Sequence, residues 1–521
     1  MNPRTRREFL QQVGQGMLVA GIGYGAALDL GLTRAWAEEA AAPLSFGPSE
    51  PLVRLLQDTH PEKLLPLLAA RLKSGASLRE LVSAAALANV RTFGGEDYIG
   101  FHTMMALVPA FEMAGELPEP RQALPVFKVL YRNGNRIHEH GGHGSEVLHQ
   151  VPVASIEPGA SGGEEALRDA IRRKDLAESE QILARAIRQS PAEAYNQLLI
   201  AIEDGYEVHR VVMPHRAWQL SELVGKEHAE TMLRQSVHYC VNLEKNPNFT
   251  NFVAPARELL PKLLDQYKLL SRPLGTKQAD DATIETLSNS IFRSTREQAA
   301  EAAAAALAEG FSVETLGEAL SIAANQLVLR DSGRPAGMAS KEKPAGSVHG
   351  DSIGVHACDT VNAWRNMALV SNQRNAAACL ILGAYQVAND RTARREDFAQ
   401  WEPYPLAEHF EKLREKSAEG LLKEADGAIR ENDQARACAA VARYAELGLS
   451  SRPMFDLMLP YAISEDGALH AEKYYRTVTE EFAATRPAFR WRQLLALARV
   501  TASEYGHPAP GYAEAKGILG V

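Results

Sequence analysis

LLPLLAARLKSGASLRELVSAAALANV, residues 64–90, shows how this chain is built. Apolar residues recur at three- and four-residue spacing on both sides of Gly75, as they do in amphipathic helices. Gly75 suits the C-terminus of a first helix, and Ser77 with Glu80 forms a Ser-x-x-Glu capping box at the start of a second. The stretch therefore predicts two consecutive helices joined by a short turn.

The same pattern extends over the rest of the sequence. Residues 228–246 and the alanine-rich run 302–327 have the same helical spacing, and Gly310 with Ser312 repeats the Gly75 and Ser77 pattern. Ser190 followed by Pro191 is a helix start, because proline is favoured at the first helical position. Few stretches alternate between apolar and polar residues over the length of a strand. The sequence thus predicts an all-α protein.

Two internal alignments suggest a duplication. Placing residue 72 on residue 307 and residues 198–209 on 459–470 produces these matched pairs: Leu72 with Leu307, Gly75 with Gly310, Ser77 with Ser312, Ala201 with Ala462, Ile202 with Ile463 and His209 with His470. Chance similarity between alanine-rich helices is the alternative. We predict quasi-two-fold helical-hairpin repeats around a central cavity, with halves at residues 50–270 and 281–505 and a polar joint at 271–281.

Histidines occupy similar places in these repeats. Each follows a glycine closely and begins a mostly apolar helix; the four are His102, His209, His356 and His470. Equivalent positions of a quasi-symmetric fold project toward one axis, so we expect the four imidazoles to converge. Neutral imidazoles are ligands for zinc, copper and iron, and they also serve as acids and bases near neutral pH. The alternative is that each is a hydrogen-bonded core residue.

Polar residues near these histidines are candidates for supporting or catalytic roles. His215 and Asn362 lie six residues after His209 and His356, and Asp359 lies one turn after His356, where it is placed to fix an imidazole tautomer. Three arginines, which either receive an anionic or carbonyl group of a substrate or lie at the surface, are Arg210, Arg216 and Arg365.

Residues 136–150 contain a second group of histidines in a glycine-rich stretch, His138, His140, His143 and His149. Short histidine-rich tracts bind metals, and this one could form a lid ligand or a metal-loading patch, but its glycines favour a solvated loop. The cysteines are too far apart for zinc-ribbon or haem-attachment spacing, and the sequence leaves their pairing open; they are Cys240, Cys358, Cys379 and Cys438.

The N-terminus resembles a twin-arginine export signal. Thr5-Arg6-Arg7-Glu8-Phe9-Leu10 precedes a weakly hydrophobic, glycine-rich run that ends at the small-residue site Ala35-Trp36-Ala37. The run contains Asp29 and is shorter than the roughly 20 strongly apolar residues of a membrane span. We expect residues 1–37 to be removed on export to the periplasm, with no stable membrane anchor left. Signals of this kind carry proteins that are already folded, often with a cofactor inserted.

Composition excludes several classes of function. The formal net charge is −9 over 521 residues, which does not suit binding to nucleic acid or anionic lipid. The chain has no GxGxxG after a strand, no GxxxxGK[ST], no HExxH, and no nucleophile elbow with a GxSxG between a strand and a helix. Dinucleotide-binding folds, nucleoside triphosphatases and common hydrolases are therefore not predicted.

The stretches that begin at Gly100, Val208 and Gly354 resemble those of a group of bacterial all-helical proteins and, more distantly, the questin oxidase-like family. That resemblance implies oxygen-dependent cleavage of an aromatic ring compound with a reduced nicotinamide as reductant. It covers His102, His209 and His356, and less clearly His470. Because free NADPH is not expected in a periplasm, the export signal argues against nicotinamide dependence.

The sequence thus leaves three hypotheses. The first is a periplasmic oxidoreductase in which the four histidines hold iron or copper, less favourably zinc, and His215, Asp359 or Asn362 acts on a small organic substrate. The second is a non-catalytic helical-repeat binding protein in which the histidines belong to the core. The third is a metal-free lyase or hydrolase that uses the same histidines as acids and bases.

Overall fold

A computed structural model describes residues 42–151, 164–341, 343–393 and 397–521. The chain divides into two units. The smaller comprises residues 1–44 and 149–152, and its described part contains an isolated β-bridge between Pro43 and His149. The larger comprises residues 45–148 and 153–521 and carries every helix discussed below. The predicted export signal, residues 1–37, lies outside the described residues.

The described residues form 23 α-helices and no extended strand, so the all-α prediction is confirmed. The helices before the predicted joint are α2 (Glu50–Asp58), α3 (Pro61–Lys73), α4 (Leu78–Phe93), α5 (Tyr98–Gly115), α6 (Ala123–His140), α7 (Ala166–Arg173), α8 (Leu176–Gln189), α9 (Pro191–Ile202), α10 (Val208–Val224), α11 (Ala229–Glu244) and α12 (Pro247–Gln266). Those after it are α13 (Asp281–Arg293), α14 (Arg296–Ala308), α15 (Val313–Leu329), α16 (Ile353–Val370), α17 (Gln373–Arg391), α18 (Ala407–Glu411), α19 (Ala418–Arg430), α20 (Gln434–Glu446), α21 (Arg452–Ser464), α22 (Ala471–Ala484), α23 (Trp491–Glu504) and α24 (Tyr512–Leu519).

Short 3₁₀ turns lie between these helices. They are η1 (Gly47–Ser49), η2 (Glu119–Arg121), η3 (Gly142–Ser145), η4 (Lys226–His228), η5 (Ala336–Met338), η6 (Phe398–Gln400) and η7 (Gly467–Leu469).

Helix starts follow the capping residues that the sequence predicts. The Ser77 side chain accepts a hydrogen bond from the backbone N–H of Glu80, and the Glu80 carboxylate accepts from the backbone N–H of Ser77, which completes the capping box of α4. Ser190 and Ser312 accept equivalent bonds at α9 and α15. Each such cap satisfies a helix N–H that has no intrahelical partner.

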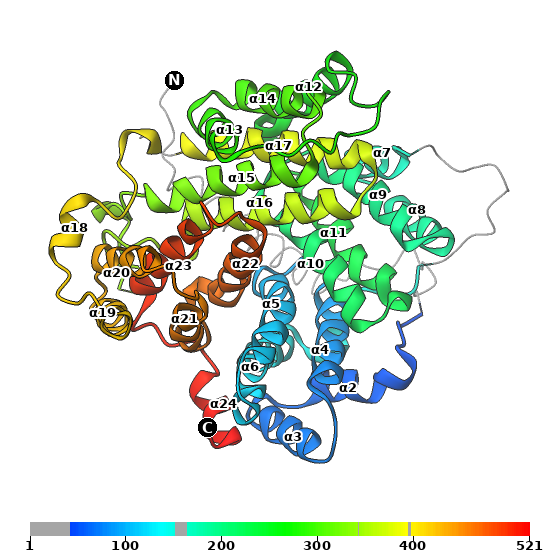
Figure 1. The fold of residues 1–521 in the computed structure, drawn as a ribbon. Coiled ribbons are helices and arrows are strands. Elements are labelled where there is room, and N and C mark those ends of the chain that lie inside the picture. The colour runs from blue at the N-terminus through cyan, green and yellow to red at the C-terminus, as the bar shows by residue number, and fades with distance from the viewer. Residues whose placement is uncertain (1–41, 152–163, 342, 394–396) are drawn as a thin grey trace. The chain divides into compact units, whose positions relative to one another are not determined.

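Helices α15, α16 and α17 pack side by side, and α14 covers α17 (Figure 1). Gly354 allows the close approach of α16 to α15. A Cβ at Gly354 would lie 2.7 Å from the backbone nitrogen of Val328, closer than atoms can pack. Because Gly354 is two residues before His356, this close approach also sets the position of that histidine.

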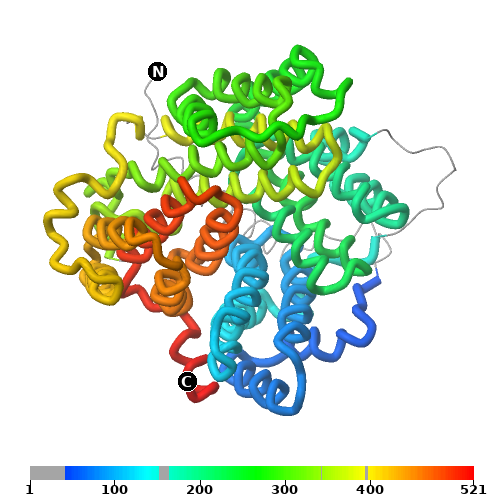
Figure 2. The backbone as a smooth tube through the Cα atoms, in the orientation of Figure 1, coloured from blue at the N-terminus to red at the C-terminus, as the bar shows by residue number. Residues whose placement is uncertain are grey.

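Four helices with distant positions in the sequence form a closed ring. Helix α5 packs on α10, α10 on α16, α16 on α22, and α22 on α5, and their labels surround one region in Figure 1. The backbone trace shows the same four segments, coloured from cyan to orange, meeting there (Figure 2). The histidines of interest all lie at or near the N-terminal ends of these helices.

The structure also places the predicted joint and the two predicted halves. The predicted joint is a loop between α12 and α13 that forms a β-bridge from Lys277 to Phe311. Both predicted halves belong to the larger unit, and the duplication and its central cavity stay predictions. No helix within the described ranges is both long and apolar enough to cross a membrane.

Candidate functional site

The four predicted histidines converge. We call His102, His209, His356 and His470 the imidazole cluster. Nε2 of His102 lies 3.2 Å from Nε2 of His209, and Nε2 of His356 lies 3.0 Å from Nε2 of His470. Ring centroids are 5.3 Å apart between His102 and His470 and 6.1 Å apart between His209 and His356. The imidazoles therefore meet in the same cyclic order as their helices.

Each histidine is placed by the start of its helix. His102 is in the first turns of α5 and is fully buried, and His470 is the N-cap residue of α22 and is 2% exposed. His209 and His356, near the starts of α10 and α16, are partly exposed. The cluster thus has a deeply buried side at His102 and His470 and a less buried side at His209 and His356.

Three of the four rings have Nδ1 fixed by an oxygen acceptor. Nδ1 of His102 donates to the carbonyl oxygen of Tyr98 at 2.7 Å, and Nδ1 of His470 donates to that of Ala468 at 2.8 Å. The Glu207 carboxylate accepts from Nδ1 of His209 at 2.7 Å. In a neutral ring this leaves the lone pair on Nε2, the atom that faces the other rings. Metal-binding histidines in proteins are fixed in the same way.

Each short Nε2–Nε2 contact needs a proton or a cation between the nitrogens. Two facing lone pairs repel each other, so each pair must share either a proton or a cation. Two ligands about 2.05 Å from one ion lie about 2.9 Å apart at a right angle and about 3.3 Å apart at a tetrahedral angle. The observed separations of 3.0 and 3.2 Å fall within this interval. The cluster therefore has the spacing of metal ligands within each pair.

Burial keeps the deep imidazoles neutral. Burial, followed by the charge of Lys473, places the pKa of His102 and His470 well below the usual value. Burial and the nearby His209 lower the pKa of His356 to about 3. The N-terminal ends of four helices add positive potential that acts in the same direction. Neutral imidazole is the form that binds a metal.

The two pairs do not yet form a single ligand set. In the part of the chain that the structure describes, no group of three or more His, Cys, Asp or Glu side chains is arranged to hold a metal ion as it stands. Around one tetrahedral ion, imidazole centroids lie about 5 Å apart. The ring centroids match this spacing in three pairs: 4.8 Å for His102 and His209, 4.8 Å for His356 and His470, and 5.3 Å for His102 and His470. The centroids of His209 and His356 are farther apart, at 6.1 Å.

The predicted supporting residues form a second polar group on the same helices. Asp359 accepts a hydrogen bond from the hydroxyl of Thr477 at 2.7 Å and makes none to an imidazole. Asn362 donates to Glu480 and Glu481 at 2.9 and 2.8 Å. His215 is buried with Nε2 unpartnered, and burial lowers its pKa to about 3. No hydrogen bond joins His215, Asp359 or Asn362 to the imidazole cluster, and a catalytic role for them stays a prediction.

The three arginines that the sequence singled out are not exposed, and they differ in the partners that hold their guanidinium groups. Arg210, Arg216 and Arg365 are all buried. Arg210 pairs with Glu244 at 3.1 Å and donates to the carbonyl of Ala201, which makes it a structural residue. Arg365 pairs with Glu481 at 3.2 Å. The expectation of surface positions was wrong, because Arg210 and Arg365 reach buried carboxylates on other helices and Arg216 is buried as well.

Lys473 is a residue of the site that was not predicted from the sequence. It lies one turn after His470 on α22 and is 2% exposed. Burial lowers the pKa of its amine to about 7, against the opposing charges of Asp359 and Glu472. The sequence could have indicated this residue, because a lysine three residues after a candidate ligand lies on the same face of a helix as that ligand.

Sequence analysis also missed Glu207, which has two roles. Its Oε2 accepts the backbone N–H groups of His209 and Arg210, which caps α10, and it also accepts the hydroxyl of Tyr239 at 2.9 Å. Its Oε1 holds His209. Burial raises the pKa of Glu207, but the charge and hydrogen bond of His209 and the backbone bonds outweigh this and lower it to about 2.

We predict that Glu207→Ala lowers both stability and metal affinity. Loss of the cap costs about 1 kcal/mol in the free energy of unfolding, and loss of the support for His209 reduces metal affinity by about 10- to 100-fold. Glu207→Gln retains acceptor oxygens and falls between Glu207→Ala and the parent protein. Urea unfolding and metal titration measure the two effects. Tyr239→Phe, which leaves the contact between Glu207 and His209 intact, is the control; equal metal affinities in all variants would refute a supporting role.

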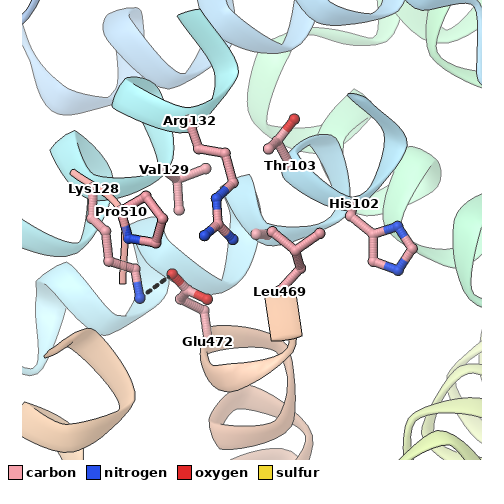
Figure 3. A pocket seen from close by; sticks show the side chains of 9 residues that line it. His102, Thr103, Lys128, Val129, Arg132, Leu469, Glu472 and Pro510 are labelled. Atoms are coloured by element: carbon pink, nitrogen blue, oxygen red, sulfur yellow. Dashed lines mark ion pairs between the residues drawn. The ribbon is translucent and has the colours of Figure 1, made fainter. Parts of the chain in front are cut away.

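A small pocket is lined in part by His102 and Thr103 of α5. Its polar lining includes Lys128, Arg132 and Glu472, and its free volume suits about one water molecule. In Figure 3 the ring of His102 points away from these side chains, and a dashed line marks the ion pair between Lys128 and Glu472. The ion pair at this pocket joins α6 to α22.

The second histidine group does not assemble. His138 and His140 lie within α6, which continues to His140, so the prediction of a loop there was wrong. His138 packs against His60, His140 against Phe93, and His143 contacts Asp58. The helix extends because Gly141, in a left-handed conformation, is the residue that ends it.

All four cysteines are buried free thiols. Burial raises the pKa of each, so none is an activated nucleophile.

His238 provides a pH-dependent contribution to stability. Its ring nitrogens contact Glu96 at 2.9 Å and Glu180 at 2.7 Å. Burial alone would lower the pKa of His238, but the two carboxylates outweigh burial and raise it. The stabilisation is therefore complete below the unfolded-state pKa of about 6.5 and is lost as pH rises through the higher folded-state pKa. We expect His238→Gln to lower the free energy of unfolding by about 1–2 kcal/mol more at pH 5.5 than at pH 9, as measured by urea unfolding. An equal loss at both values would mean that the ring is not charged in the native state.

No known protein family, curated protein or solved structure matches the chain. The geometry of the imidazole cluster is therefore the observation that bears on function.

Proposed function

We propose that this protein is a periplasmic metal-dependent oxidoreductase in which the imidazole cluster holds one iron or copper ion. The observation that carries the proposal is the orientation of the Nε2 atoms. They meet in two pairs at ligand spacing, while three Nδ1 atoms are fixed by oxygen acceptors. When neutral, these three rings each present an unprotonated Nε2 to a neighbouring ring.

The donor set narrows the choice of metal. Imidazole nitrogen suits late first-row ions, whereas calcium and magnesium prefer oxygen ligands. Iron and copper add redox chemistry that zinc lacks, and for this reason we favour them over zinc. The bound metal would supply a site for electron transfer to or from a small organic substrate. The partly exposed side at His209 and His356 is where such a substrate has access.

The chain's own residues supply proton-transfer groups and aromatic contacts around this side. Tyr98, half exposed, packs 4.3 Å from the ring of His102. Phe101 lies 4.8 Å from His102 and 5.1 Å from His209 by ring centroids. Lys473, a buried amine with a lowered pKa, lies one turn after His470 on α22. The aromatic rings would limit the access of bulk water to the cluster, and the amine of Lys473 would hold a proton near it.

A metal-free acid–base enzyme is the second candidate, and the same contacts motivate it. His209, held by Glu207, would donate a proton from Nε2 to His102, and His356 would donate to His470, whose Nδ1 is already a donor. This arrangement satisfies the Nε2 contacts without a metal, and it agrees with the incomplete ligand set of the described residues. Metal content separates the two candidates.

The proposed export route agrees with a metal loaded before translocation. The sequence resemblance to a twin-arginine signal implies transport of the folded chain by the twin-arginine translocase. Cytoplasmic loading would then protect the site from competing periplasmic metals. The small-molecule substrate and the translocase are the partners that we propose.

The test is the metal content of mature protein purified from periplasm without chelators, measured by inductively coupled plasma mass spectrometry. The proposal predicts close to one equivalent of iron or copper per chain. Protein that carries only trace metal, and whose apo form takes up neither ion from solution, would refute it and favour the metal-free enzyme. One equivalent of zinc would retain the metal site and refute the redox assignment.

A further inference from the structure

We propose that a cavity between α21 and α24 binds a small carboxylate whose apolar body is the size of one aromatic ring. Three segments that are distant in the sequence line this cavity: residues 117–124, α21 and α24. Helix α24 packs on α6 and on α3, and the three labels lie together in Figure 1. The cavity shares no lining residue with the imidazole cluster, so this inference does not depend on the proposed function.

The volume of the cavity sets the size of the ligand. It is about 120 Å³, whereas the pocket beside His102 has about 10 Å³. One water molecule needs about 10–15 Å³, and an apolar cavity of about 150 Å³ binds benzene. The cavity therefore has room for one six-membered ring and is too small for a nucleotide.

Much of the lining is apolar. Leu117, Leu124, Pro460 and Ile463 contribute to it from the segment before α6 and from the last two turns of α21. Leu124 and Ile463 are buried, Leu117 is half-buried and Pro460 is exposed. The apolar lining thus extends from the core to the surface, and a ring placed against it would be removed from water, which favours binding.

Two cations lie beside this apolar lining. Arg121 and Lys516 both line the cavity and are exposed. Among the residues that the structure describes, neither side chain has a carboxylate within ion-pair distance or makes a hydrogen bond. By contrast, Arg132 of α6 and Arg452 of α21 each pair with a carboxylate. The charges of Arg121 and Lys516 are therefore available to an anion that enters the cavity.

The combination of these features selects the ligand class. A guanidinium binds a carboxylate through two parallel hydrogen bonds, and an ammonium adds a point charge. Tyr512, which also lines the cavity, carries a phenol hydroxyl that can donate a third bond. A neutral ring would leave these donors unused, and inorganic phosphate would leave the apolar lining in contact with water. A ring-sized monocarboxylate satisfies both parts of the site.

The first test needs no variant. Benzoate, benzyl alcohol and inorganic phosphate are titrated into the purified protein by isothermal calorimetry. We expect saturable binding of one benzoate, and binding of benzyl alcohol at least about tenfold weaker, because it lacks the charged hydrogen bonds. Phosphate should bind more weakly than benzoate as well. No benzoate binding at millimolar concentration, or equal affinity for benzoate and benzyl alcohol, would overturn the proposal.

The second test places the bound benzoate in this cavity. The double variant Arg121→Gln/Lys516→Gln should weaken benzoate binding by about tenfold or more and leave that of benzyl alcohol unchanged. Leu117→Trp, which fills the cavity from its half-buried side, should weaken both. Lys423→Gln, at an exposed lysine of α19 that does not line the cavity, is the control. Circular dichroism verifies the fold of each variant. A folded double variant that binds benzoate as the parent does would show that the anion binds elsewhere and would refute the site.

Discussion

Replacing His470 with alanine is expected to remove the metal from the protein. Structural zinc sites with four ligands are worth about 10–16 kcal/mol, or about 3 kcal/mol per ligand, which corresponds to a loss of about 100- to 1000-fold in affinity. His102→Ala should have an effect of the same size, because both rings are deeply buried and have a fixed Nδ1. Equilibrium titration of apoprotein with Cu²⁺ or Fe²⁺ measures the change.

The matched control is His60→Ala. His60 is an exposed histidine outside the imidazole cluster, so its removal should leave metal affinity unchanged. Far-ultraviolet circular dichroism of each variant separates loss of ligand from loss of fold. Folded His470→Ala or His102→Ala protein with the affinity of the parent would show that these imidazoles are not ligands.

Removal of Lys128 is expected to produce the largest loss of stability. Its ammonium lies 2.5 Å from Glu472, and both side chains are 5% exposed. Lys128→Met leaves the Glu472 carboxylate buried without its partner, and removing one member of a buried ion pair costs about 3–5 kcal/mol. The pair joins α6 to α22, so the position of His470 depends on it. Urea unfolding measures the free energy, and metal titration reports the displacement of His470.

The double variant Lys128→Met/Glu472→Leu tests the cause. Replacing both partners with apolar residues removes the unpaired charge, so most of the lost stability should return. A double variant as unstable as Lys128→Met would show that packing of the lysine chain, and not its charge, was responsible. Lys423→Met, at an exposed pair with Glu419, should change the free energy of unfolding by less than about 0.5 kcal/mol.

Local sequence signals predicted the helical fold. Ser77, Ser190 and Ser312 begin helices because their side-chain oxygens satisfy backbone N–H groups within three residues, and such interactions need no knowledge of the rest of the chain. The convergence of the four histidines followed from their equivalent places relative to helix starts. The repeat that motivated this prediction is still a hypothesis.

Contacts between distant segments could not be predicted in this way. Glu207 is both a helix cap and the support of His209, but nothing in its local sequence distinguishes it from other caps. Lys473 is identified by its burial, which depends on α16 and α22 packing together. Asp359 was expected to hold an imidazole, yet it accepts from Thr477, a residue 118 positions away. Likewise, Arg210 was misjudged because its acceptors on α9 and α11 are tertiary contacts.

X-ray absorption at the metal edge of the protein as purified from periplasm tests the central claim most directly. The account predicts a first shell of three to four nitrogen scatterers at about 2.0–2.1 Å with the multiple-scattering pattern of imidazole, reduced in the His470→Ala variant. A first shell of oxygen or sulfur without imidazole scattering, or a sample without metal at the edge, would contradict it.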